Sequence, residues 1–302
     1  MVMDRAFLDR HERILMEAAI VERLRRESDV TLHPRLVHAT LLEDEAGRGE
    51  LRRIYGDYVG VARQARLPLL LCTPTWRANR ERLEEAGVAD DLNRDAVHFL
   101  KELRVGPDAV DPAVLIGGLI GCKNDCYRPE EGLTSEEAES FHSWQLERLA
   151  GSGADFLVAE TLPNIGEAVG IARAMARSGL PSVISFVIDR RGRLLDGTPL
   201  ADASEMVDGA VDRQPLGYMI NCAHPTFLRA AAQPPAMFER LIGVQANASS
   251  LDHDRLDGAA QLQADDIPSW GEEMLTLHRQ YGVKILGGCC GTGVEHLRYL
   301  AS

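Results

Sequence analysis

Short apolar runs alternate with longer amphipathic segments along most of the chain. Apolar runs rich in Val, Ile and Leu are typical of strands in a parallel sheet that is covered on both faces. The segments between them carry apolar residues at helical spacing. The predicted strands are Leu67–Cys72, Val114–Ile120, Ala154–Ala159, Ser182–Ile188, Gly217–Asn221, Leu241–Ala246 and Val283–Leu286, with Ile14–Ala19 as an eighth.

The intervening segments predict helices, and two of them carry start signals. Thr134 and Ser135 precede Glu137, and Ser269 precedes Glu272, as in N-caps with Glu at the third position. The helix candidates are Glu50–Ala65, Ser135–Ala150, Ile165–Ser178 and Ile267–Gln280, with another beginning near Val294. Eight strand–helix units without a linker predict a single-domain TIM (β/α)8 barrel over residues 1–302, and a doubly wound open sheet is the alternative.

Composition and charge limit the kinds of partner that the protein is expected to bind. Acidic residues outnumber basic ones 46 to 33, the net charge is −13, and no basic stripe is present to neutralise phosphates. We therefore expect no nucleic-acid or membrane partner. The N-terminus lacks a secretory apolar stretch, and no apolar run reaches the roughly 18 residues that span a bilayer. We expect a soluble cytoplasmic protein whose six cysteines stay reduced.

Three cysteines follow predicted strands at the edge where barrel enzymes place their functional groups. Cys222 follows the sixth run in "GYMINCAHP", and Cys289 and Cys290 follow the eighth in "ILGGCCGTG". Adjacent cysteines rarely form a disulfide, because the bridge strains the peptide bond between them. The flanking glycines permit a turn that aims both sulfurs at one ion. The alternative is burial, because free cysteine is a common core residue.

Zinc is the metal that three such thiols suit best. Thiolates bind Zn²⁺ at about 2.3 Å, and three protein ligands leave a fourth position open for substrate. Three thiolates overcompensate the charge of the metal, so it is a poor activator of water, which argues against a zinc hydrolase. A substrate thiolate in the fourth position stays electron-rich. The site therefore favours alkyl transfer to a thiol.

These residues resemble the homocysteine S-methyltransferase family. "INC" at Cys222 and "GGCCGT" at Cys289 and Cys290 are similar to its signature, as are "GADFLVAETLPNIGEA" from Gly153, "SVISF" from Ser182 and "VLIGGLIG" from Val114. The resemblance implies a zinc-dependent barrel enzyme with these three cysteines as metal ligands. It also implies that Glu160 holds the amino group of the substrate, for which the alternative is a salt bridge to a neighbouring Lys or Arg.

Further substrate-binding residues are expected at other strand ends, and two stretches depart from the family pattern. Ser185 and Asn221 are expected to shape the pocket or, equally, to satisfy backbone groups of the loops, and Thr73 is expected to take over part of the role of the family's motif at the end of the second strand. The first strand ends in "MEAAIVE", where relatives carry Asp-Gly-Gly or Asp-Gly-Ala; Glu17 takes the place of the Asp. The second strand ends in "LCTPTWRAN". These departures leave the zinc ligands in place and leave the identity of the thiol open.

The leading hypothesis is an S-methyltransferase that moves a methyl group from a small sulfonium or ammonium donor to homocysteine or a related thiol. The alternative is a zinc-bearing or redox-sensing barrel protein with lost activity, to which the Cys122/Cys126 pair in "GCKNDCYRPEEG" would belong. That pair also fits two unrelated thiols in a loop. His224 is a candidate for proton removal or for a structural role. The sequence leaves the methyl donor and the oligomeric state open.

Overall fold

Eight parallel strands close into a barrel in the computed structural model, which describes residues 3–104, 113–252 and 263–302. Each strand pairs with its sequence neighbour, and β1 closes the ring against β8 through Ile14 opposite Ile285 and Leu15 opposite Leu286. The open-sheet alternative is therefore wrong. The strands are β1 (Ile14–Met16), β2 (Leu69–Cys72), β3 (Val114–Gly121), β4 (Phe156–Leu162), β5 (Ser182–Phe186), β6 (Gly217–Asn221), β7 (Leu241–Ala246) and β8 (Ile285–Gly288).

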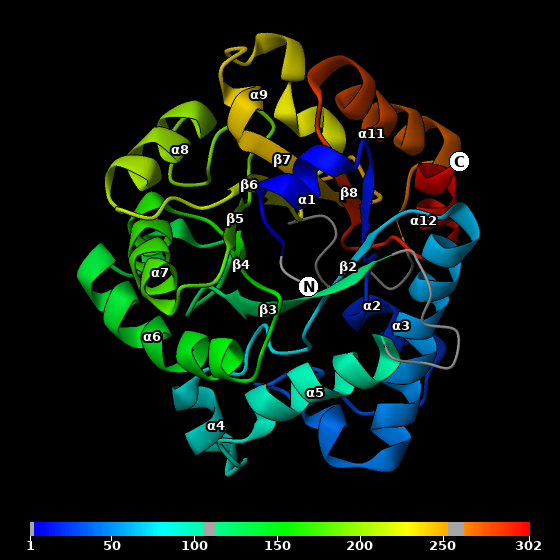
Figure 1. Ribbon diagram of the computed structural model, residues 1–302, viewed down its shortest axis with the longest axis vertical. Helices are drawn as coiled ribbons and strands as arrows, with labels where there is room; N and C mark the ends of the chain where they lie inside the picture. The colour runs from blue at the N-terminus through cyan, green and yellow to red at the C-terminus, as the bar shows by residue number, and fades with distance from the viewer. Residues whose placement is uncertain (1–2, 105–112, 253–262) are drawn as a thin grey trace.

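Helices surround the barrel, as expected when both faces of a parallel sheet are apolar (Figure 1). Among the described residues they include the five predicted ones and shorter elements in the connecting loops. The α-helices are α1 (Arg5–Arg10), α2 (Val21–Glu27), α3 (Glu45–Ala65), α4 (Arg80–Ala86), α5 (Leu92–Arg104), α6 (Ser135–Gly151), α7 (Ile165–Ser178), α8 (Leu200–Gly209), α9 (Met237–Arg240), α11 (Ile267–Tyr281) and α12 (Val294–Ala301). The 3-10 helices are η1 (Ala39–Glu43), η2 (Pro129–Glu131), η3 (Pro225–Leu228) and η4 (Ala230–Ala232).

The core has two parts. One fills the space between the sheet and the surrounding helices. The other lies inside the barrel and extends to α1, whose Phe7 and Leu8 pack with Ile14, Phe156 and Ile285. Because these contacts involve the first residues of several strands, α1 covers the N-terminal end of the barrel (Figure 1). The opposite end, where the strands finish, remains available for a site.

Several predicted boundaries need correction: the first strand ends at Met16 instead of Ala19, and α3 begins at Glu45 instead of Glu50. The helix α11 begins at Ile267, and its N-cap is Asp266, whose carboxylate accepts the Ser269 amide hydrogen at 3.2 Å. Ser269 is therefore inside the first turn and is not the cap. By contrast, Thr134 and Glu137 form the reciprocal capping box expected at the start of α6.

The fourth strand lies two residues later than predicted and extends further. It runs from Phe156 to Leu162, so that Glu160 lies within the strand rather than after it. The pairing of β4 with β5 shifts register between Ala159 and Leu162, and Thr161 has φ of 60°. Such an irregularity re-aims side chains at a barrel rim. Glu160 is thus held near the mouth by an irregular strand end.

The described residues contain no helix that combines the length and the apolar character needed to cross a bilayer.

Candidate active site

Three thiols meet at the C-terminal end of the barrel. Cys222 follows β6 directly, and Cys289 and Cys290 follow β8 directly. Their sulfur atoms all lie within 4.8 Å of one another, and they are the one group of this kind among the described residues. The sulfurs of Cys222 and Cys289 are 2.6 Å apart, and all three residues are free, partly exposed thiols. The structure thus brings together the three residues predicted to ligate zinc.

The backbone around the thiols is fixed by hydrogen bonds from neighbouring strand ends. The Cys289 amide donates to the Ala246 carbonyl at 2.8 Å, and the Cys290 amide donates to the Asn247 side-chain oxygen at 3.1 Å. Cys222 has φ of 53°, in the left-handed region that costs a residue with a Cβ of order 1 kcal/mol or more. Strain of this kind is common at functional sites, and here it directs a thiol toward the other two.

Asn221 connects Cys222 to two other strands. Its side-chain amide donates to the Cys222 sulfur at 3.6 Å, and its oxygen accepts from the Thr161 amide at 2.9 Å and the Ser185 hydroxyl at 2.8 Å. Asn221 and Ser185 are both fully buried. The structure therefore places these two predicted substrate residues behind the thiol cluster, where they orient Cys222.

The shifted pKa values of the clustered thiols favour binding of a cation. Hydrogen bonds from Cys222 and Cys289 lower the pKa of the Cys290 thiol well below its usual range. Hydrogen bonding to Cys289 and Cys290 raises the pKa of the Cys222 thiol. One thiolate is thus stabilised by its neighbours, whereas further ionisation brings like charges together. A divalent ion removes that penalty, and three sulfurs at this spacing fit the donor set of zinc with one position left for substrate.

Two carboxylates, the buried Glu17 and the partly exposed Glu160, lie at the ends of β1 and β4. A Glu17 oxygen accepts the Cys72 amide hydrogen at 2.7 Å, and the Cys72 thiol donates to a Glu160 oxygen at 3.8 Å. Burial raises the pKa of Glu160 to about 7 and that of Glu17 well above its ordinary value, which the charge of Glu160 raises further. No salt bridge to Lys or Arg is recorded for either of them in the part of the chain that the structure describes. The salt bridge that was the alternative role for Glu160 is therefore absent from the described part of the chain.

Thr73 is engaged in bonds between strand ends. Its hydroxyl accepts the Leu119 amide hydrogen at 2.9 Å and shares a hydrogen bond of 2.7 Å with the Thr75 hydroxyl. Thr75 in turn donates to the Leu119 carbonyl at 2.6 Å. Both threonines are fully buried. In the described structure, Thr73 thus links the loop after β2 to β3.

Sequence reasoning missed residues that support the cysteine turn. Asn247 directly follows β7, and Asn221 is the last residue of β6, so a polar residue at a strand end was a usable signal. The Thr292 hydroxyl donates to the Cys289 carbonyl at 2.6 Å and accepts the Ala19 amide hydrogen at 3.2 Å. Glu22 accepts the Gly291 amide hydrogen. These last two contacts join segments about 270 residues apart, and no local pattern predicts them.

The remaining candidates have structural surroundings. Burial raises the pKa of both Cys122 and Cys126, which disfavours their reactive thiolate forms. The His224 ring caps η3 by accepting from the Thr226 amide at 3.4 Å, and its other nitrogen lies 3.3 Å from an Asp265 oxygen. These contacts favour the structural role for His224.

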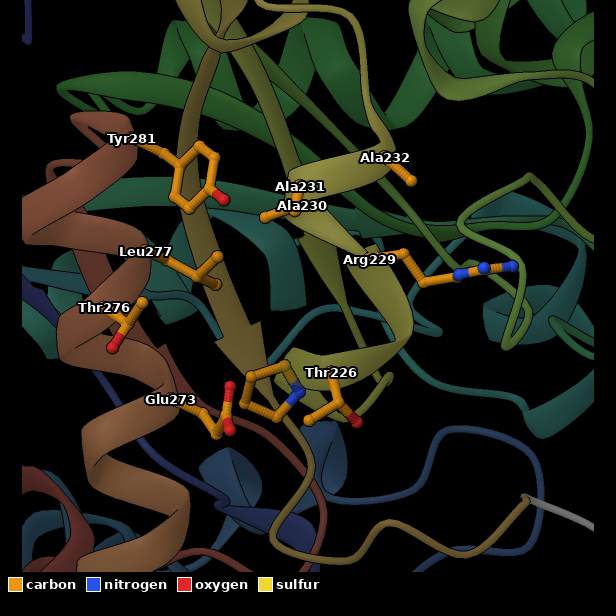
Figure 2. A pocket seen from close by; sticks show the side chains of 10 residues that line it. Thr226, Arg229, Ala230, Ala231, Ala232, Glu273, Thr276, Leu277 and Tyr281 are labelled. Carbon is orange, nitrogen blue, oxygen red and sulfur yellow. The ribbon is translucent and has the colours of Figure 1, made fainter.

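A cavity of about 420 Å³ lies outside the thiol cluster, between η3–η4 and α11 (Figure 2). Ala230, Ala231 and Leu277 form much of its wall, and Arg229 points away from α11. None of the three clustered cysteines and neither Glu17 nor Glu160 lines it. The cavity lies where the short side chains of η4 face α11, away from the residues predicted to bind the metal and the substrate.

Comparisons with known proteins identify the family of this chain. The homocysteine S-methyltransferase family model matches residues 14–302. The chain is 28% identical to a homocysteine S-methyltransferase of Escherichia coli K12, over 95% of this chain and 94% of the relative. It is 26% identical to a homocysteine S-methyltransferase of Bacillus subtilis 168, over 98% and 95%. The metallated form of the E. coli homocysteine methyltransferase MmuM has the same fold, with a TM-score of 0.75, 24% identity and 98% coverage of both chains. The chain therefore belongs to the homocysteine S-methyltransferase family of methyltransferases.

Proposed function

We propose that this protein is a zinc-dependent S-methyltransferase that moves a methyl group from a small sulfonium or ammonium donor to the thiol of homocysteine or a related thiol. The observation that carries the proposal is the convergence of Cys222, Cys289 and Cys290 at the barrel mouth. We assign these residues as the zinc ligands. A bound zinc ion would keep the acceptor thiol deprotonated at neutral pH.

Glu17 and Glu160 are proposed to bind the amino group of the acceptor. An ammonium group supplies the positive charge that these two carboxylates lack among the described residues. Binding it returns both carboxylates to their ionised form, since an opposite charge lowers a raised pKa. This recognition fixes the acceptor at one end while its thiol reaches the cysteines.

The methyl transfer is then a displacement between positioned groups. A lone pair of the acceptor sulfur forms the new S–CH3 bond, and the electron pair of the broken bond returns to the donor sulfur or nitrogen, which becomes neutral. No proton moves in this step, so it requires no general base. The protein contributes mainly orientation and a site that excludes water.

The charge and compartment of the protein fit this chemistry. The thiolates and the two carboxylates make the mouth attractive to a cationic donor. A cytoplasmic location is proposed with the function, because a reducing compartment keeps the cysteines free.

Purified protein with zinc, homocysteine and a panel of donors, including S-methylmethionine and betaine, tests the proposal by mass detection of methionine. We expect methyl transfer from at least one donor, loss of at least about a hundredfold in Cys290→Ser, and near wild-type rates in the matched control Cys122→Ser. Equal rates in Cys290→Ser and Cys122→Ser contradict the proposal.

A further inference from the structure

The side chains of β4 alternate between the two sides of the barrel wall as far as Glu160 and change phase after it. Val158 lies in the core inside the barrel and Ala159 in the core outside it, so Glu160 is the next residue to face inward. Regular alternation would turn Leu162 inward as well, yet Leu162 belongs to the outer core. Over this interval β4 has one residue more than its partner β5. Thr161 is therefore the extra residue, and it sets the direction of the strand end that carries Glu160.

Hydrogen bonds hold Thr161 in an unfavourable conformation. Its φ of 60° lies in the left-handed region, which a β-branched residue rarely adopts. Its hydroxyl accepts the Nε1 hydrogen of Trp76 at 2.7 Å and donates to the Glu160 carbonyl at 2.5 Å. Because an indole N–H only donates, this bond leaves the hydroxyl hydrogen free for the carbonyl. Thr161 is 4% exposed, so removal of the indole donor would leave its hydroxyl without a partner of this kind in a buried position.

The peptide unit between Glu160 and Thr161 connects the two halves of the barrel mouth. Its carbonyl accepts the Thr161 hydroxyl, and its amide donates to the Asn221 side-chain oxygen at 2.9 Å. Asn221 also donates to the Cys222 sulfur at 3.6 Å. The position of the Glu160 carboxylate relative to the thiol cluster thus depends on how this one peptide unit is held.

The indole of Trp76 lies against the end of β3, next to this peptide unit. Gly121 pairs with Glu160 in the register of β3 and β4. A Cβ at Gly121 would collide with the indole nitrogen of Trp76, and the Gly121 amide donates to the Trp76 carbonyl at 3.0 Å. The absence of a side chain at Gly121 therefore leaves the space through which the indole reaches Thr161.

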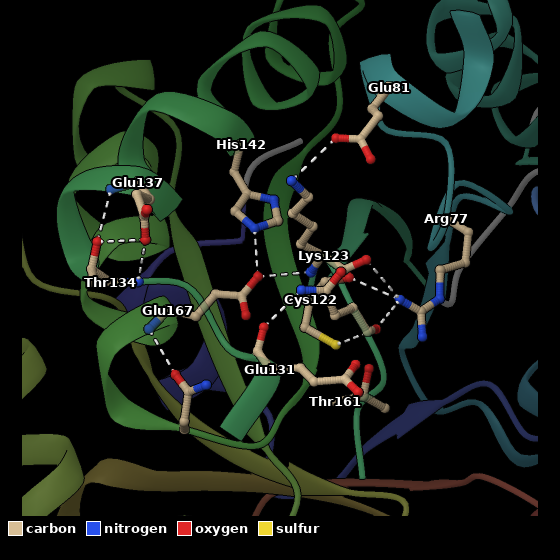
Figure 3. A network of polar contacts seen from close by, with 12 residues as sticks. Arg77, Glu81, Cys122, Lys123, Glu131, Thr134, Glu137, His142, Thr161 and Glu167 are labelled. Atoms are coloured by element: carbon tan, nitrogen blue, oxygen red, sulfur yellow. Dashed lines mark hydrogen bonds and ion pairs between the residues drawn. The ribbon is translucent and has the colours of Figure 1, made fainter. Parts of the chain in front are cut away.

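Arg77 fixes the indole from its ring face. The guanidinium carbon lies 4.0 Å from the centre of the Trp76 ring, a contact that a planar cation and an aromatic face favour. The guanidinium is itself held, because Nη1 donates to the carbonyls of Cys122 at 2.9 Å and Asn124 at 2.6 Å (Figure 3). Arg77 is only 9% exposed. Trp76 is therefore packed on its face as well as at its edge, and its N–H is aimed at Thr161.

We propose that Trp76 and Thr161 are positioning residues for the acceptor, whose hydrogen bond holds the peptide unit after Glu160 so that this carboxylate meets the amino group of an amino-acid thiol while the thiol reaches the metal ligands. This inference rests on the proposed function. The two side chains act through Glu160 and need not touch the substrate. Placement of the acceptor at both of its ends is what an oriented displacement requires.

Two thiols that differ only in the amino group test this role by binding, without turnover. Calorimetry on the zinc-loaded protein compares homocysteine with 4-mercaptobutyrate, which has the same thiol and carboxylate and lacks the amino group. The wild type should bind homocysteine at least about tenfold more tightly, since only homocysteine offers an ammonium group to Glu160. A side chain that positions Glu160 should affect homocysteine alone, whereas a side chain that merely supports the fold should affect both thiols.

Trp76→Phe and Thr161→Val each remove one partner of the hydrogen bond and keep most of the side-chain volume. We expect both variants to bind homocysteine about tenfold more weakly and 4-mercaptobutyrate within about twofold of the wild type, each measured at full zinc occupancy. Thr161→Ser keeps the hydroxyl and should bind both thiols within about twofold of the wild type. The matched control is Trp144→Phe, because the indole of Trp144 on α6 is likewise covered by a guanidinium, that of Arg148 at 3.8 Å. It should change neither affinity.

The possible results separate this role from a structural one and from the proposed function. Unchanged homocysteine affinity in both Trp76→Phe and Thr161→Val overturns the proposal, as do equal losses for the two thiols. A wild type that binds both thiols equally also overturns it, because Glu160 then holds no amino group. If the wild type prefers homocysteine, the two variants lose that preference and no donor yields a methylated product, the proposed function fails while the positioning role stands.

Discussion

The side-chain amide of Asn221 donates to the sulfur of Cys222 at 3.6 Å. The oxygen of the same side chain accepts from the Thr161 amide and the Ser185 hydroxyl. Asn221 therefore connects one thiol of the cluster to the ends of β4 and β5. A group that orients a metal ligand affects metal affinity without binding the metal.

Replacing Asn221 should weaken the metal site. We expect Asn221→Ala to reduce zinc affinity by about 10- to 100-fold, the range found when such supporting residues are lost. Competition with a chromophoric chelator measures the affinity. Ser185→Ala removes only one of the two hydrogen bonds to the Asn221 oxygen and should have a smaller effect. Equal zinc affinity in Asn221→Ala and the wild type would show that Cys222 needs no such support.

Glu160 should control acceptor binding. Glu160→Gln removes a charged hydrogen-bond acceptor, and a loss of about 1.5–3 kcal/mol corresponds to a homocysteine KM raised about 10- to 100-fold. Zinc content should not change. A KM that rises equally for donor and acceptor would contradict a specific contact with the acceptor.

The raised pKa of Glu160 also predicts a pH dependence with a definite sign. The folded protein binds a proton at Glu160 with a pKa of about 7, against an ordinary value of 4.5. The contribution of Glu160 to the free energy of unfolding therefore becomes less favourable to the folded state as the pH rises from about 4.5 through about 7. Relative to the wild type, Glu160→Gln should gain stability between pH 5 and pH 8 in urea unfolding. Acceptor affinity of the wild type should rise over the same interval, because the ionised carboxylate binds the ammonium group. A stability difference independent of pH would show that Glu160 is not perturbed.

The glycine before the cysteine pair should tolerate no side chain. A Cβ at Gly288 would collide with Thr292, whose hydroxyl supports the Cys289 carbonyl. Gly288→Ala should destabilise the protein by about 1–3 kcal/mol and lower zinc affinity. Gly49→Ala is the matched control, because nothing lies within 4 Å of its Cβ position in α3, and we expect it to stabilise by up to about 1 kcal/mol. Chemical unfolding of both variants gives the comparison, and a neutral Gly288→Ala would contradict the close packing of this turn.

The alternation of apolar runs predicted the barrel because each strand is buried on both faces and leaves a continuous apolar segment in the sequence. The limits of β6 and β7 were predicted exactly for that reason. In β4, the side chain of Asp155 accepts the Ile116 amide hydrogen before the strand begins, and the strand continues past Glu160. Both features depend on neighbouring strands rather than on local pattern.

In the site, too, some features could be predicted from the local sequence and others depend on contacts between distant segments. The sequence alone places the three cysteines at strand ends. Two of them form a pair between glycines, and the third follows another strand. The contacts of Glu22 and Thr292 with the cysteine turn and with Ala19 depend on closure of the barrel between its first and last strands. Arg77 donates to three consecutive backbone carbonyls of the loop after β3. Every residue has a carbonyl group, so the sequence does not show which ones accept these bonds.

Metal removal should destabilise the wild-type protein, because a ligand that binds only the folded state stabilises it. A chelator is expected to lower the melting temperature of the wild type and of Cys122→Ser, and to have little effect on Cys290→Ser. The affinity for zinc should fall as the pH falls, since binding requires the thiols to lose protons. A chelator effect of equal size in Cys290→Ser, measured by calorimetry, would locate the metal elsewhere.

Zinc X-ray absorption spectroscopy tests the central claim most directly, since it counts the sulfur atoms around the metal. For the zinc-loaded protein we predict three sulfur ligands at about 2.3 Å and one lighter atom. Addition of homocysteine should raise the count to four sulfurs, whereas homoserine, which carries a hydroxyl in place of the thiol, should leave it at three. A sulfur count that homocysteine does not change, or a resting site with fewer than three sulfurs, would contradict the account.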